Sequence, residues 1–91
     1  MGEALILAPV LDLNAAEPLK AELLARRGAD LAVDASGVER LGGLCLQVLL
    51  SAIRTWRADG VNLSFSVMSE SFADQWAAFG APAIEAEGAF A

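Results

Sequence analysis

Hydrophobic positions along the chain form short apolar runs separated by longer segments with helical spacing. Residues 4–8 and 31–35 are compact apolar runs, typical of strands buried on at least one face, and the first run ends at Pro9. Residues 61–67 alternate apolar and polar side chains with a strict period of two, so their two serines are expected to face away from the core. The pattern therefore predicts three strands.

Two helices are predicted between these strands. The first begins near Asn14, where the sequence resembles a capping box, or at Pro18 as its first helical residue, and it ends at Gly28. The second begins at the pair Gly42-Gly43 and ends at Asp59-Gly60.

A third helix is predicted after the last strand. Ser69 is its expected N-cap, and Gly80 followed by Pro82 stops it. Its aromatic side chains recur at helical spacing and are predicted to be core residues: Phe72, Trp76 and Phe79. Residues 85–91 are expected to form a loose tail.

The order of these elements indicates the fold class. Strands that alternate with helices in this way predict an α/β fold, with a small mixed β-sheet of about four strands and the helices packed against it. Residues 1–84 are expected to form a single domain, because no repeat or linker divides them.

Composition excludes several classes of function. The net charge of −6 argues against nucleic acid and against an anionic membrane surface as partners. The chain has no histidine and one cysteine, so a metal site, a bound cofactor and enzymatic activity are not expected. The longest apolar run, residues 4–11, is about half of what a membrane span requires. With a single cysteine, a soluble protein of the reducing cytoplasm is predicted.

The second predicted helix has two different faces. Its core-facing stripe is expected to consist of Cys45, Leu49, Ala52 and Trp56, flanked by Leu46, Val48 and Ile53. The opposite face carries Leu44, Gln47, Ser51 and Thr55, with Arg54 beside them. No acidic residue occurs from position 41 to 58, whereas solvated helices usually carry both charges. This face is interpreted as a docking surface for a partner or as an uncharged solvent face, and Leu50 is a further candidate contact.

Three features around the start of this helix have alternative interpretations. Cys45 is a reactive thiol at a helix N-terminus or an inert core thiol. The pair Gly42-Gly43 cradles an anion or permits a tight turn with close packing. Asp34 organises the loop after its strand or contacts a partner.

The amino-acid sequence of this region resembles that of a known family. Asp34-Ala-Ser-Gly-Val38, then Leu41, two small residues and Leu46-Gln-Val-Leu-Leu50 are similar to the signature of STAS domains, named from sulfate transporters and anti-sigma factor antagonists. The resemblance extends more loosely over nearly the whole chain. Residues 38–50 resemble in particular the stand-alone STAS proteins of alphaproteobacterial chemotaxis systems.

The resemblance implies a non-enzymatic switch or adaptor that docks on a kinase or a related ATPase-fold protein. In anti-sigma factor antagonists the turn reads Asp-Ser-Ser-Gly-Leu, and its second serine is phosphorylated by the partner kinase. That motif falls on residues 42–46 of this chain, with Gly42 at the acidic position and Leu44 at the acceptor position. The phosphorylation switch is therefore expected to be lost, while the docking surface is kept.

The resulting prediction is a signalling adaptor that docks on the chemotaxis histidine kinase CheA and modulates phosphate flow to, or loss from, a response regulator. The alternatives are an anti-sigma factor antagonist and the STAS subunit of an ABC-type lipid transport complex. The predicted partner-binding residues are Asp34, Ser36, Arg40, Gly42, Gly43, Leu44, Gln47, Ser51 and Thr55.

Overall fold

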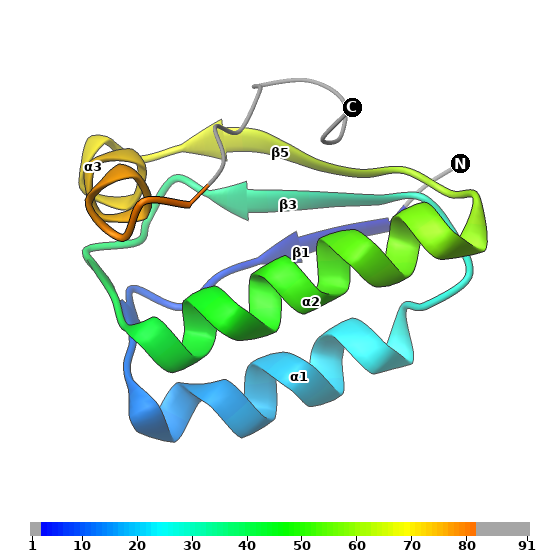
Figure 1. The fold of residues 1–91 in the computed structure, drawn as a ribbon, viewed down its shortest axis with the longest axis horizontal. Helices are drawn as coiled ribbons and strands as arrows, with labels where there is room; N and C mark the ends of the chain where they lie inside the picture. Colours follow the sequence, from blue (N-terminus) through cyan, green and yellow to red (C-terminus); the bar gives the residue numbers. More distant parts are fainter. Residues whose placement is uncertain (1–2, 82–91) are drawn as a thin grey trace.

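Parallel strands form the sheet against which the helices pack (Figure 1). The computed structural model describes residues 3–81. A three-stranded sheet has the order β1-β3-β5, and a separate short pair joins β2 to β4. The strands are β1 (Glu3–Ile6), β2 (Val10–Leu11), β3 (Leu31–Ala35), β4 (Arg40–Leu41) and β5 (Leu63–Met68).

In the described part of the chain, three α-helices alternate with the strands. The helical segments are a 3-10 turn, η1 (Leu13–Ala15), and the helices α1 (Ala16–Ala25), α2 (Gly43–Asp59) and α3 (Glu70–Ala78). The sheet grows in one direction from β1 to β5, and right-handed crossovers in that order place successive helices on the same face. Accordingly α1 and α2 lie side by side along the sheet, and α3 lies at the carboxyl ends of the strands (Figure 1).

The predicted α/β class, with helices alternating with strands, is confirmed. The observed sheet differs from the predicted one in its details. Within residues 3–81 every strand pairing is parallel, whereas a mixed sheet of about four strands was expected. The strands of the main sheet are parallel because helices α1 and α2 return the chain to the starting end before each new strand. The pair of β2 and β4 has two residues per strand, too few to produce a periodic pattern.

Helix α2 supplies much of the core. All residues of its predicted core-facing stripe are buried except Val48, which is half-buried and packs against the same cluster. Helix α1 contributes Ala16, Leu19 and Leu23 to this cluster. Among residues 3–81, none of the helices has the length and apolar character that crossing a membrane requires.

The first helix begins at a different cap from the one predicted. The carboxylate of Asp12 accepts a hydrogen bond from the backbone N–H of Ala15 at 3.1 Å, and Asn14 lies inside the 3-10 turn that follows. The α-helix then continues through Pro18 in its first turn. Asp12 was missed because a 3-10 turn separates it from the regular helix.

Strand β5 departs from strict alternation at a bulge. Val33 pairs with Phe65 and Asp34 with Val67, so Ser66 is the extra residue. Of the two serines in this strand, Ser64 is half-buried and Ser66 is exposed. The bulge reverses the order of faces after it, so Val67 is half exposed and Met68 packs against the core, whereas strict alternation predicts Val67 inside.

Helix α3 confirms two of its three predicted core aromatics. Ser69 caps the helix by accepting a hydrogen bond from Phe72 N–H at 2.9 Å. Phe72 and Trp76 are buried, but Phe79 is 49% exposed. Phe79 is the C-cap residue, one position beyond the last helical turn, and its ring lies next to Gly43 rather than in the core.

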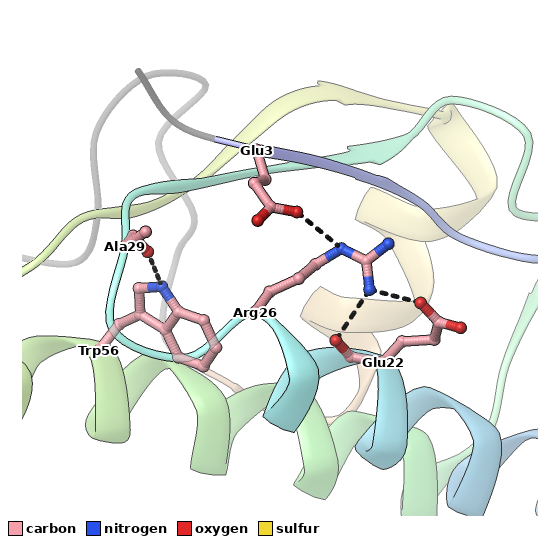
Figure 2. Close-up of polar contacts among 5 residues, drawn as sticks. All are labelled: Glu3, Glu22, Arg26, Ala29 and Trp56. Atoms are coloured by element: carbon pink, nitrogen blue, oxygen red, sulfur yellow. Dashed lines mark hydrogen bonds and ion pairs between the residues drawn. The ribbon is translucent and has the colours of Figure 1, made fainter.

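Polar contacts fix the end of α1 to its neighbours (Figure 2). The Arg26 guanidinium forms ion pairs with Glu3 of β1, at 3.7 Å, and with Glu22 one turn earlier, and it also bonds the Glu22 carbonyl. The indole N–H of Trp56 donates to the Ala29 carbonyl oxygen at 2.8 Å. The Arg26 contacts join the end of α1 to β1, and the Trp56 contact joins α2 to the connection between α1 and β3. The predicted tail, residues 85–91, lies outside the described residues.

Candidate functional site

The turn that leads from β3 into α2 is fixed on one side by the segment before α1. The Pro9 carbonyl oxygen accepts hydrogen bonds from the backbone N–H of Glu39 at 2.7 Å and of Arg40 at 3.2 Å. The Leu11 carbonyl oxygen accepts from Gly42 N–H at 2.8 Å. The short pair of β2 and β4 therefore positions the first residues of α2.

Helix α3 holds the other side of the same turn. The Ser69 hydroxyl donates to the Val38 carbonyl oxygen at 2.6 Å. The side-chain amide of Gln75 accepts from Leu41 N–H at 2.8 Å and donates to the Glu39 carbonyl oxygen at 3.0 Å. With partners on both sides, the turn is a rigid support for the start of α2.

Close packing explains the first glycine of the predicted turn. Gly42 is the N-cap of α2, and a Cβ atom built on it would lie 3.0 Å from the Leu11 carbonyl oxygen. Its φ of −87° is accessible to any residue, so space and not backbone conformation favours glycine here. This supports the tight-turn interpretation of Gly42-Gly43 over the anion cradle.

Asp34 organises the loop at the end of β3. Its carboxylate accepts a hydrogen bond from Ser36 N–H at 2.9 Å. The Ser36 hydroxyl and then this backbone N–H lower the pKa of Asp34, because both stabilise the charged form. The carboxylate is thereby engaged within its own loop, as the loop-organising interpretation of Asp34 predicts.

Cys45 is a core thiol. It is fully buried, and its S–H donates to the Asp12 carbonyl oxygen at 3.3 Å. Burial raises the pKa of the thiol, and the negative charge of Asp12 raises it further. Both effects oppose the thiolate that nucleophilic chemistry requires.

We therefore expect Cys45 to resist alkylation in the folded protein. The measurement is labelling with iodoacetamide at pH 8, followed by intact mass, with and without guanidinium chloride. Because the chain contains one cysteine, a single mass shift reports this thiol. Labelling in native buffer as fast as in denaturant would contradict the assignment and reopen thiol chemistry at this position.

A groove of about 630 Å³ runs between α1 and α2. Four predicted partner-binding residues line it: Leu44, Gln47, Ser51 and Thr55. We call this feature the α1–α2 groove. Leu44 lies in the first turn of α2 with 48% of its surface exposed, so an apolar side chain stands at the position where the resemblance places the acceptor serine.

Helix α1 contributes residues to the groove that sequence reasoning missed. Lys20 and Leu24 line it, and Leu24 is 57% exposed. The two residues are four apart and share a face of α1. Their spacing was a usable signal, combined with the expectation that right-handed crossovers place α1 beside α2.

The predicted partner-binding residues thus separate into two groups. The groove contains four of them, whereas the others lie between the end of β3 and the first residue of α2: Asp34, Ser36, Arg40, Gly42 and Gly43. The two groups are adjacent in the chain at Gly43 and Leu44. The turn acts as the support of the groove, and the groove is the part with a concave surface.

Comparison with known proteins gives one result. A family model described as "Mlab, STAS domain" matches residues 2–83, which include every described strand and helix. No curated protein and no solved structure matches the chain. The matched residues contain both the turn before α2 and the α1–α2 groove.

Proposed function

Because the chain belongs to the STAS domain family, we propose that it is a non-enzymatic adaptor of the cytoplasm that docks on the chemotaxis histidine kinase CheA. In this role it modulates phosphate flow to, or loss from, a response regulator. The resemblance of residues 38–50 to the stand-alone STAS proteins of chemotaxis systems supports the chemotaxis assignment. The observation that carries the docking role is the exposed Leu44 at the end of a groove beside a rigid turn.

Control of such an adaptor resides in its partner. A phosphate at the start of α2 would add a charge of about −1.5 to −2 and repel or reorient a docked kinase. The leucine at position 44 has no hydroxyl to carry it. The complex is therefore constitutive, and its occupancy follows the concentration and conformation of the kinase.

Leu44→Asp is expected to weaken the complex with purified CheA by about tenfold or more. The substitution removes apolar surface from the contact and places a carboxylate where an apolar partner surface would desolvate it. Isothermal titration calorimetry of the two purified proteins measures the change. The fold is expected to persist because position 44 is half exposed, which circular dichroism checks.

Leu13→Asp is the matched control. Leu13 is also exposed, at 73%, and it lies outside the groove. The substitution therefore makes the same chemical change at a site where no partner is expected to dock. Its affinity for CheA is expected to stay within about twofold of the parent chain. Equal weakening by both variants, or no complex with the parent chain, would overturn the proposal. Preferential binding to an anti-sigma kinase, or to the ATP-binding subunit of an ABC lipid transporter, would overturn the chemotaxis assignment.

A further inference from the structure

We infer that the occupant of the α1–α2 groove is an amphipathic α-helix whose apolar stripe is flanked by carboxylates. This inference rests on the proposed function, because it assigns the chemistry of the partner segment to the same groove. It adds what the partner must present: apolar anchors along one face, and negative charge on both sides of them.

The groove offers an apolar base between two exposed leucines. Its base consists of buried or half-buried side chains from both helices: Leu23, Val48, Ala52 and Trp56. Leu24 of α1 and Leu44 of α2 are the exposed apolar side chains that line it. Apolar side chains docked along this base would be removed from water.

The charges around this base are positive. Lys20 and Arg54 line the groove, and no Asp or Glu is among the described residues that line it. Neither of the two cations has an ion pair within residues 3–81, whereas Arg26 and Arg27 are paired with carboxylates. In a chain with twelve acidic and six basic residues, this local charge is opposite in sign to the net charge of −6. Complementarity therefore favours an acidic partner.

The shape of the groove favours a helix as the partner. The backbone groups of α1 and α2 are bonded within each helix, so this surface has no strand edge that could pair with an extended peptide. Recognition must use side chains, which a helix presents on one face at spacings of three and four. The segment of α2 from Leu44 to Thr55 is about 16 Å long, enough for about three turns of a docked helix.

The test uses two stapled, fluorescein-labelled helical peptides of about four turns. Both carry leucines at positions i, i+3, i+4 and i+7. One has glutamates beside the leucine stripe, and the other has lysines at the same positions. At low salt we expect the glutamate peptide to bind about tenfold more tightly by fluorescence anisotropy, and we expect the difference to shrink as salt screens the charges.

Two variants of matched charge localise the effect. Arg54→Glu is expected to weaken the glutamate peptide about threefold to tenfold and to strengthen the lysine peptide. Arg57→Glu makes the same charge change on the same helix, outside the groove, and is expected to stay within about twofold of the parent chain. Equal effects of the two variants, or equal affinities of the two peptides, would overturn the inference.

Two further outcomes separate this inference from the proposed function and from self-association. A CheA complex that is sensitive to Leu44→Asp, with no peptide binding, would leave the adaptor role standing and overturn the helical occupant. Peptide binding without a CheA complex would overturn the adaptor role and leave the helical occupant standing. A dimer in analytical ultracentrifugation that dissociates in Leu44→Asp would assign the groove to a second copy of the chain and overturn the inference.

Discussion

Phe72→Ala is expected to lower the free energy of unfolding by about 3–5 kcal/mol. Phe72 has no exposed surface, and its ring centroid lies 5.8 Å from that of Phe65 and 5.7 Å from that of Trp76. Alanine would leave a cavity among aromatic rings that are held by β5 and α3, so the site cannot collapse easily. Folded domains usually have a free energy of unfolding of about 5–15 kcal/mol, so this loss is a large fraction of the total stability. Urea denaturation followed by circular dichroism measures it.

Phe79→Ala is the control for this prediction. It removes the same side chain from the end of the same helix, where 49% of the surface is exposed. We expect a cost of about 1 kcal/mol or less, because part of the ring is already in water. Equal losses from the two variants would mean that Phe79 belongs to the core, as its spacing in the sequence predicts.

The contrast between Phe72 and Phe79 illustrates what periodicity can predict. Spacing along a helix indicates which face a residue occupies, and this was sufficient for Phe72, for Trp76 and for the whole buried stripe of α2. Spacing does not indicate where the helix ends. Phe79 follows the last helical residue, so the face predicted for it no longer applies.

Local sequence patterns alone predict one of the two sides of the groove. Residues of α2 share a face, and an amphipathic pattern without acidic residues marks it in the sequence. Lys20 and Leu24 belong to it only because α1 packs beside α2, a tertiary contact that no local pattern contains. The bulge at Ser66 has the same origin, because it depends on the pairing of β5 with β3.

The turn before α2 depends on contacts that are distant in sequence. Its hydrogen-bond partners, Pro9, Leu11, Ser69 and Gln75, come from segments before and after it. The sequence predicted the glycine turn, the cap at Ser69 and the position of the helix. The rigidity of the turn follows from the fold, because only the assembled elements bring these partners together.

Trp56 connects this fold to the groove, and Trp56→Ala is expected to cost about 3–5 kcal/mol of stability. The side chain is 2% exposed, lies at the base of the groove and donates its indole N–H to the Ala29 carbonyl oxygen (Figure 2). Its removal takes away core volume and the support of the groove together. We therefore expect weaker partner binding under conditions in which the variant is still folded, measured by calorimetry beside a urea titration.

Trp56→Phe separates the two contributions of the side chain. Phenylalanine keeps a ring in the core and loses the hydrogen bond to Ala29, so the expected cost is about 1–2 kcal/mol, clearly below that of alanine. Because most of the apolar base of the groove is retained, partner affinity is expected to change by less than about threefold. A loss as large as that of Trp56→Ala would show that the hydrogen bond, and not the packed ring, holds α2 against the connection between α1 and β3.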